Sequence, residues 1–342
     1  MHMIKNRMLC GAAAAALLLS GACASEESTP RNEAAKRHLD AWMSVNHPGI
    51  GPTGLGIYIL DDQPGTGETL QDADAFLFAE YTFRDLDGNI SSTTLEKLAR
   101  QLGTYQQSNC YGPSVLVNSK AYTQAGLLEM FKGMKVGGTR TAVIPGWLNV
   151  TEDYDTAQEY LDKCTGSNAV CTVTLTGKTD DIVKWEVDTL EKYTARYMND
   201  VDSTFYGWYY QQLKAPKDTV TLPRDTSFYI NYTGRLLNGQ VFDTTVEDTA
   251  KVYGLYASSK TYQPVYITLN EDYTRITMAQ SSSSSGSTVQ NGFSYCLSKM
   301  KRYEKGRCAF YSRLGYGYSG SGSKIPRFAP LVFDIELVDK PE

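Results

Sequence analysis

The chemistry open to this chain is limited first by where its histidines lie. The three histidines are His2, His38 and His47, all upstream of the segments expected to form domain cores. A Ser-His-Asp or Cys-His nucleophile system needs a histidine in its site, and a catalytic zinc site usually uses one as a ligand. The sequence therefore predicts neither kind of site, and we expect no metal and no cofactor.

The sequence also contains no phosphate-binding motif. No Gly-rich loop of the G-x-x-x-x-G-K-[ST] or G-x-G-x-x-G type opens a helix after a strand, so the backbone cradle for a nucleotide is absent from the sequence. The formal net charge is −5 without a basic block, whereas a nucleic-acid surface needs clustered lysines and arginines to neutralise phosphates. We expect no nucleic acid among the partners.

Cysteines are the remaining reactive side chains. Cys164 and Cys171 flank a short segment and could close a small loop, and Cys296 could meet Cys308 if a helix packs on the strand that follows it. The alternative is that the thiols are buried, with no histidine near to activate them. Beyond the amino-terminal segment the cysteines are Cys110, Cys164, Cys171, Cys296 and Cys308. Because their number is odd, at least one stays unpaired or pairs between chains.

A hairpin pattern from Phe228 to Thr245 is the most specific signal in the chain. Residues alternate through the first strand, a turn falls at Asn238-Gly239, and Val241 and Phe242 open the second strand. The run resembles the FKBP signature, a V-x-Y-x-G strand followed by L-x-D/N-G-x-x-F-D-S/T-S/T. Further motifs follow in the family's order at residues 314–317, 324–326 and 330–337.

This resemblance to FKBP-type peptidyl-prolyl cis-trans isomerases implies a fold and an activity. The fold is an antiparallel sheet of about five strands curled round a short helix at residues 290–300, with a cleft between them. Rotation of an X-Pro amide needs no nucleophile, only stabilisation of the twisted amide in a water-poor apolar pocket. The catalytic residues that the resemblance implies are Tyr232, Phe242, Asp243, Tyr316 and Phe333. The substrate-binding residues that it implies are Val289, Gln290, Phe293, which stands where the family usually has Trp, and Ile325.

Other interpretations of these residues stay open. Phe242 and Phe333 alternate along strands as core residues do, Asp243 could accept hydrogen bonds in a turn, and Tyr232 could be a core tyrosine. Residues 246–288, with a serine run at 281–285 that predicts a mobile loop, replace the family's shorter flap and could cover the cleft. The alternative function is a non-catalytic chaperone or protein-binding lipoprotein with an FKBP fold. A glycan- or surface-binding lipoprotein is a third possibility.

Residues 49–178 resemble the same family more faintly. Residues 80–88 match the hairpin, and residues 131–138 with Ile144-Pro145 match the helix end and the next strand. However, Ser91-Ser92 stand where Phe-Asp is expected, and Leu127 stands where the floor Trp is expected. We therefore expect a degenerate FKBP-like domain that binds proline poorly and serves as a scaffold or as a partner-binding copy.

The amino-terminal segment predicts export and lipid attachment. Lys5 and Arg7 precede an apolar run too short to span a bilayer, as in a signal peptide covering residues 1–22. Residues 18–23 resemble the cleavage box of bacterial lipoproteins, which makes Cys23 the expected lipidation site; a plain secretory signal is the alternative. Glu26-Glu27 resemble the surface-export signal of Bacteroidetes lipoproteins. We expect lipid anchoring in the cell envelope, on the periplasmic or surface face of the outer membrane, with proline-containing polypeptides as clients.

Length and composition leave room for two domains. The chain has 342 residues, of which 42% are hydrophobic and 21% charged, which is typical of globular material. We expect a tether with a short amphipathic helix at 23–48, the degenerate domain at 49–178, a linker at 179–219 and the isomerase domain at 220–342. An apolar stripe defines the linker helix: Ile182, Trp185, Leu190, Tyr193 and Tyr197. The predicted class is α+β, two FKBP-like domains joined by an amphipathic helix.

Overall fold

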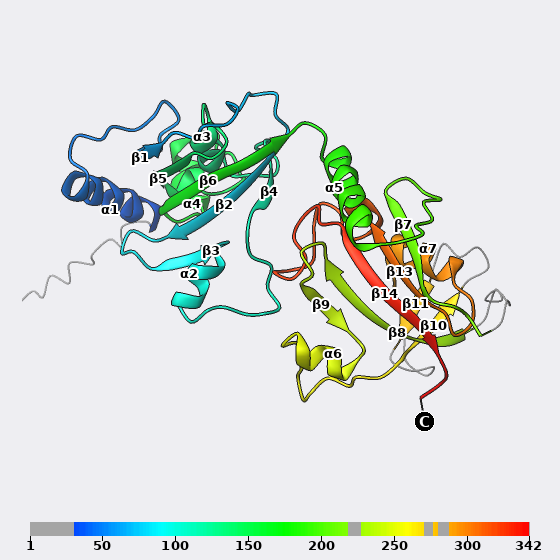
Figure 1. The fold of residues 1–342 in the computed structure, drawn as a ribbon. Coiled ribbons are helices and arrows are strands. Elements are labelled where there is room, and N and C mark those ends of the chain that lie inside the picture. The colour runs from blue at the N-terminus through cyan, green and yellow to red at the C-terminus, as the bar shows by residue number, and fades with distance from the viewer. Residues whose placement is uncertain (1–30, 218–226, 270–275, 280–286, 342) are drawn as a thin grey trace, which may run out of the picture.

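The computed structural model describes residues 31–217, 227–269, 276–279 and 287–341. These residues form two antiparallel sheets, each with its own helices, and helix α5 (Ile182–Tyr197) connects them (Figure 1). The predicted α+β class with two sheet domains and a connecting helix is confirmed. The predicted signal peptide, Cys23 and the serine run 281–285 fall outside the described residues. Within the described ranges, none of the helices is both long and apolar enough to cross a membrane.

The first domain is built round a sheet with the strand order β1-β5-β6-β2-β3, and β4 pairs with the first half of β2. Its core forms where Leu127, Met130 and Phe131 of a short helix pack against buried sheet residues such as Leu77 and Leu175. Its elements are α1 (Arg31–Asn46), β1 (Tyr58–Gln63), β2 (Phe76–Arg84), β3 (Ile90–Thr93), α2 (Glu96–Gln101), β4 (Ser114–Val117), α3 (Ala125–Phe131), β5 (Thr139–Ile144), the 3-10 turn η1 (Gly146–Leu148), α4 (Ala157–Lys163) and β6 (Ala169–Thr179).

The second domain has a larger sheet, in the order β12-β11-β10-β8-β14-β13-β7, with β9 paired to β8. Its core contains Phe293 and Leu297 of a helix packed against Ile230 and Ile335 of the sheet. Its elements are β7 (Trp208–Lys214), β8 (Ser227–Leu236), β9 (Val241–Thr244), α6 (Glu247–Val252), β10 (Val265–Leu269), β11 (Ile276–Ala279), β12 (Ser287–Thr288), α7 (Asn291–Lys299), β13 (Lys305–Phe310), the 3-10 turn η2 (Ser312–Leu314) and β14 (Leu331–Val338).

The predicted sheet of about five strands is too small for this second domain. Eight strands are present in the described residues, because the linker and the segment 246–288 both contribute. Strand β7, which lies before the predicted domain boundary at residue 220, pairs with β13 along its length. Strands β10, β11 and β12 extend the opposite edge of the sheet beyond β8.

Helix α5 packs on both domains. Trp185 lies against Phe78 of β2, with ring centroids 4.5 Å apart, while Leu190 is buried with Ala309 and Val332 of the second sheet. The predicted stripe is correct except at its end, where Tyr197 is 50% exposed. Because the helix touches both sheets, it is part of the contact between the domains.

The two proposed disulfides are not formed. All five cysteines in the described residues are free thiols. Cys171 lies inside strand β6 in the core of the first domain, whereas Cys164 ends helix α4. Cys296 and Cys308 are both buried in the core of the second domain, and burial raises the pKa of the Cys296 thiol. Cys171, Cys296 and Cys308 are therefore core residues, and burial in apolar surroundings disfavours the reactive thiolate form of a cysteine.

Residues 81–117 repeat residues 232–268 without a gap. Tyr81, Thr94 and Tyr111 stand at one constant offset from Tyr232, Thr245 and Tyr262. The same hydrogen bonds recur, since the Thr94 hydroxyl accepts from Tyr81 N–H at 2.9 Å and the Thr245 hydroxyl accepts from Tyr232 N–H at 2.9 Å. The helix and loop after β9 are therefore a shared feature of both domains and not an insertion confined to the second.

Candidate active site

The predicted aromatic residues of the second domain gather round Phe333 of β14. The ring centroids of Phe242, Phe293 and Tyr232 lie 5.6, 5.1 and 6.3 Å from that of Phe333. Phe310 stacks on the same ring at 5.8 Å. The Phe242 and Phe293 contacts are edge-to-face, an arrangement that stabilises aromatic pairs. These five rings, called the aromatic cluster below, come from four strands and one helix.

Strand β8 makes room for this cluster at Gly234. A Cβ atom at Gly234 would lie 2.6 Å from the Phe242 ring and 2.7 Å from the Phe333 ring, closer than a side chain can approach. Gly234 is paired with Phe333 on one side and with Asp243 on the other. The glycine is thus required by ring packing.

Helix α7 packs on the cluster and contributes Phe293 to it. Its first turn is fixed by Gln290, whose carbonyl oxygen accepts hydrogen bonds from the N–H groups of Phe293 and Ser294 at 3.1 and 3.0 Å. Gly292 lets the helix lie directly on Phe310, because a Cβ there would come within 2.4 Å of that ring. Phe293 is consequently only 4% exposed.

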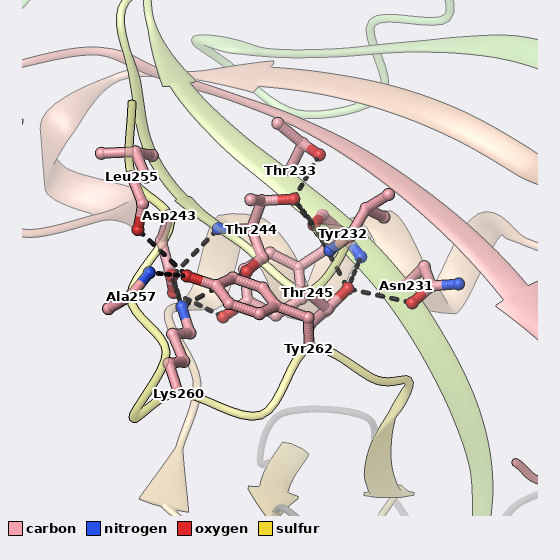
Figure 2. A network of polar contacts seen from close by, with 11 residues as sticks. Asn231, Tyr232, Thr233, Asp243, Thr244, Thr245, Leu255, Ala257, Lys260 and Tyr262 are labelled. Carbon is pink, nitrogen blue, oxygen red and sulfur yellow. Dashed lines mark hydrogen bonds and ion pairs between the residues drawn. The ribbon is translucent and has the colours of Figure 1, made fainter. Parts of the chain in front are cut away.

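Asp243 connects the cluster to the segment that follows β9 (Figure 2). The Tyr232 hydroxyl donates to one carboxylate oxygen at 2.6 Å, and Lys260 Nζ and Thr244 N–H donate to the other at 2.6 and 2.9 Å. Burial first, and then the negative charge of Asp243, raise the pKa of Tyr232 well above its usual value. The Tyr232 hydroxyl therefore remains a protonated donor to Asp243.

The loop between β13 and β14 supplies Tyr316 and Ile325. Ile325 is a buried member of the core that contains the aromatic cluster, and Tyr316 packs against that core as a half-buried residue. Burial and the nearby charge of Asp243 raise the pKa of the Tyr316 hydroxyl, and the side chain of Gln290 acts in the opposite direction. The Tyr316 hydroxyl is therefore close enough to Asp243 and Gln290 for both to affect its pKa.

The nine predicted residues differ in how accessible they are. Tyr232, Phe242, Phe293, Ile325 and Phe333 keep only 4–9% of their surface exposed. Half-buried side chains form the accessible rim beside them: Asp243, Val289, Gln290 and Tyr316. Gln290 N–H donates to no backbone carbonyl of the described residues, which leaves it available to an acceptor at this rim.

Sequence reasoning missed Lys260, which reaches Asp243 from an ordered loop. The Tyr262 hydroxyl accepts from Ala257 N–H and donates to the Leu255 carbonyl, both at 3.0 Å. Its ring stacks on Tyr256 with centroids 5.5 Å apart. The same stacked pair occurs in the first domain as Tyr105 and Tyr111. The tyrosine spacing that both domains share is the sequence signal from which this ordered loop could have been predicted.

Contacts from the first domain were also missed. Cys110 N–H donates to the Ser323 carbonyl at 2.7 Å, and the Ser323 hydroxyl donates to Asn109 Oδ1 at 2.8 Å. Gln240 Nε2 donates to the Asn109 carbonyl at 2.8 Å. The first domain thus holds the loop that carries Tyr316 and Ile325. No motif in the sequence marks these residues.

Comparison with known proteins bears on the second domain. The family model described as FKBP-type peptidyl-prolyl cis-trans isomerase matches residues 219–338. This part of the chain belongs to the FKBP family. The matched residues cover every strand of the second sheet except β7 and include all nine predicted site residues.

Two relatives and one solved structure show how far the similarity extends. A probable FKBP-type peptidyl-prolyl cis-trans isomerase of Haemophilus influenzae is 29% identical over 164 residues, which are 47% of this chain and 55% of the relative. The macrophage infectivity potentiator of Trypanosoma cruzi is 29% identical over 114 residues, 33% of this chain and 43% of the relative. The crystal structure of FkpA from Escherichia coli covers 46% of this chain and 57% of its own at 24% identity, with a TM-score of 0.32. The chain thus spans about half the length of these relatives.

Proposed function

We propose that the FKBP domain catalyses cis-trans isomerisation of X-Pro bonds in polypeptides. The observation that supports this most directly is the aromatic cluster round Phe333, bordered by the rim of Asp243, Gln290 and Tyr316. It combines apolar side chains with a few polar groups, as binding sites for small apolar groups do.

The reaction needs a water-poor apolar environment, and it needs no nucleophile. Twisting the X-Pro amide destroys its resonance, which gives a barrier of about 20 kcal/mol. Water stabilises the planar form by hydrogen bonds to its carbonyl oxygen, so removing water from that oxygen favours the twisted form. The cluster supplies this water-poor surface, and contacts made only with the twisted amide lower the barrier.

The polar rim would hold the peptide while its amide turns. The Tyr316 hydroxyl is protonated at neutral pH, since a tyrosine pKa is ordinarily about 10 and that of Tyr316 is raised further, so it can donate to a carbonyl of the bound peptide. Gln290 N–H is a second donor at the same rim. Asp243, already bonded to Tyr232 and Lys260, orients these neighbours. No covalent bond changes in this scheme.

Access to the rings is through the half-buried rim. Since Phe242, Phe293 and Phe333 expose only 4–6% of their surface, a prolyl ring must displace these side chains slightly to reach them. Tyr316 lies in a loop with left-handed backbone at Gly317, Gly320 and Gly322, a segment in which small adjustments cost little.

The test is the rate of cis-trans isomerisation of a proline-containing tetrapeptide by the full chain. Phe242→Ala removes one wall of the cluster and should lower kcat/KM by about tenfold or more, a loss of at least 1.4 kcal/mol in transition-state stabilisation. Phe205→Ala removes a phenyl ring that is 40% exposed and outside the cluster, and should keep the rate. The proposal fails if the wild-type chain does not accelerate the reaction, or if folded Phe242→Ala is as active as wild type.

The clients and the location are part of the same proposal. Proline-containing polypeptides in the cell envelope are the expected substrates, and Cys23 is the expected site of a lipid anchor. Labelling of the expressed chain with a fatty-acid analogue, present in wild type and absent in Cys23→Ala, would support the anchor. Equal labelling of both would remove it.

A further inference from the structure

The first domain has an open cleft where the FKBP domain has its aromatic cluster. The cleft encloses about 840 Å³ and is lined by Tyr81, Phe83, Ser92 and Leu127 of the first domain and by Ile325 and Arg327 of the second. This volume lies in the upper range of natural ligand sites. The correspondence is by position, because Tyr81 and Ser92 occupy the places of Tyr232 and Asp243 in the ungapped repeat.

The cleft is open because large rings have been replaced by small side chains. Ser91 stands in the place of Phe242, and Leu127 in α3 stands in the place of Phe293 in α7. Cys171 pairs with Phe83 as Phe333 pairs with Gly234, so a cysteine occupies the position of the central ring. Phe83, which stands at the position of Gly234, adds one ring to this space. It contacts Tyr81 edge-to-face, with the two ring centroids 5.6 Å apart.

The lining combines an apolar floor with a hydrogen-bonding wall. Tyr81 and Phe83 are half-buried and pack on the core of the domain, with buried Leu127 beside them. Strand β3, whose residues 90–93 all line the cleft, is paired only with β2 in the described residues. Its second edge therefore offers backbone N–H and carbonyl groups to an extended chain.

One loop borders both sites. Ile325 lines the cleft and is also a buried member of the core of the FKBP domain, which contains Phe242 and Phe333. The loop is held against the first domain by the bonds from Ser323 to Asn109 and Cys110. A polypeptide lying in the cleft would accordingly leave it next to the loop that carries Tyr316.

We propose that this cleft is a second polypeptide-binding site, which takes an extended segment with small or polar side chains and no proline. The serines in place of Phe242 and Asp243 remove the surface that would grip a prolyl ring, while the free strand edge and the aromatic floor suit a peptide backbone. The inference rests on the proposed function in one respect, that the adjoining FKBP domain acts on polypeptides. The first domain then retains segments of a client beside the site of isomerisation.

The experiment measures binding of a fluorescein-labelled, proline-free peptide rich in Ser, Thr and Ala to the full chain by fluorescence anisotropy. Ser92 is exposed on β3, so Ser92→Trp fills the cleft from a surface position and should weaken binding by about tenfold or more. Ser91→Tyr, at the neighbouring exposed position, is a second filling variant in case the first does not fold. Ser44→Trp places the same ring on an exposed position of α1, away from the cleft, and should bind like wild type.

The outcomes separate this site from the isomerase. Binding that is lost in the two filling variants and kept in Ser44→Trp and Phe242→Ala supports the cleft. The proposal is overturned if the peptide does not bind, if filling the cleft has no effect, or if Phe242→Ala abolishes binding. It is also overturned if a labelled maltooligosaccharide binds in a Ser92-dependent way and the peptide does not. Tetrapeptide isomerisation by the same wild-type preparation reports separately on the proposed function, so either proposal can fail alone.

Discussion

Lys260 Nζ donates a hydrogen bond to Asp243 at 2.6 Å, and through this contact the loop after α6 sets the charge at the rim of the aromatic cluster. Both side chains are about 40% exposed, at 43% and 39%, so the pair contributes little to stability, on the order of 0–1 kcal/mol. Its effect is local and electrostatic. Because the positive charge of Lys260 compensates the negative charge of Asp243, the surface beside Tyr316 stays close to neutral.

Removing Lys260 should change which peptides are isomerised best. In Lys260→Ala the charge of Asp243 is uncompensated, so peptides with Lys before proline should gain and peptides with Glu before proline should lose, the ratio of their kcat/KM values shifting several-fold at low salt. The shift should shrink as ionic strength rises, because exposed charges are screened. Lys251→Ala is the matched control, since Lys251 lies on α6 and pairs with Glu247 instead. An unchanged ratio in Lys260→Ala would show that Asp243 does not face the substrate.

A methyl group at Gly234 should disrupt the cluster. Because its Cβ would lie within 2.7 Å of two phenyl rings, Gly234→Ala forces both to shift, at a cost of about 1–3 kcal/mol typical of overpacked cores. Chemical denaturation of the FKBP domain should show this loss, and isomerisation should fall with it. Gly239→Ala is a useful comparison: that turn glycine has open space around it but a φ of +89°, so it should reduce stability through backbone strain and leave the rings in place. Equal activity of the two variants would contradict the role given to Gly234.

Asn109 should stabilise the loop that carries Tyr316 and Ile325. Asn109→Ala and Ser323→Ala each remove the same hydrogen bond of 2.8 Å, a contact worth about 0.5–1.5 kcal/mol. Each should speed amide hydrogen exchange in residues 317–328, and the double variant should be no faster than either single one, since coupled partners are non-additive. Ser321→Ala, in the same loop, should have no effect, because its side chain makes no hydrogen bond within the described residues. Additive effects would mean that the two residues act separately.

The sequence predicted those elements of the fold that short local motifs determine. The hairpin at Asn238-Gly239, helix α7 and strand β14 all lie where their patterns placed them, and all nine predicted site residues lie in one region. These features depend on turn chemistry and alternation, which neighbouring residues determine. The FKBP motif also fixed the order of the site residues along the chain.

What the sequence did not reveal depends on contacts between distant segments. The Asn109–Ser323 bond and the addition of β7 to the second sheet join parts of the chain that no periodicity relates. The substitutions in the first domain predict weak proline binding and a scaffold or partner-binding role, but they do not predict an open cleft. The volume of this cleft depends on how the side chains round it pack, and the residue types alone do not determine that packing.

Glu186 should make the contact between α5 and the FKBP domain depend on pH. It is only 1% exposed, and its carboxylate accepts hydrogen bonds from the N–H and hydroxyl of Ser312 at 2.5 and 2.8 Å. Burial raises its pKa from 4.5 to about 7, and the two bonds from Ser312 oppose that rise. Because the folded-state pKa lies above the unfolded value, the contribution to stability is complete below pH 4.5 and is lost as pH rises through about 7.

The expected loss between pH 5 and pH 8 is at most about 3 kcal/mol, from roughly 1.4 kcal/mol for each unit of pKa difference. Urea unfolding followed by tryptophan fluorescence, to which buried Trp208 contributes, should show it in wild type. Glu186→Gln keeps the shape and one acceptor but cannot ionise, so its stability should be nearly independent of pH over this range. Glu191→Gln, on the same helix, should retain the wild-type slope. A wild-type slope in Glu186→Gln would place the pH dependence elsewhere, because the buried carboxyl would then have no part in it.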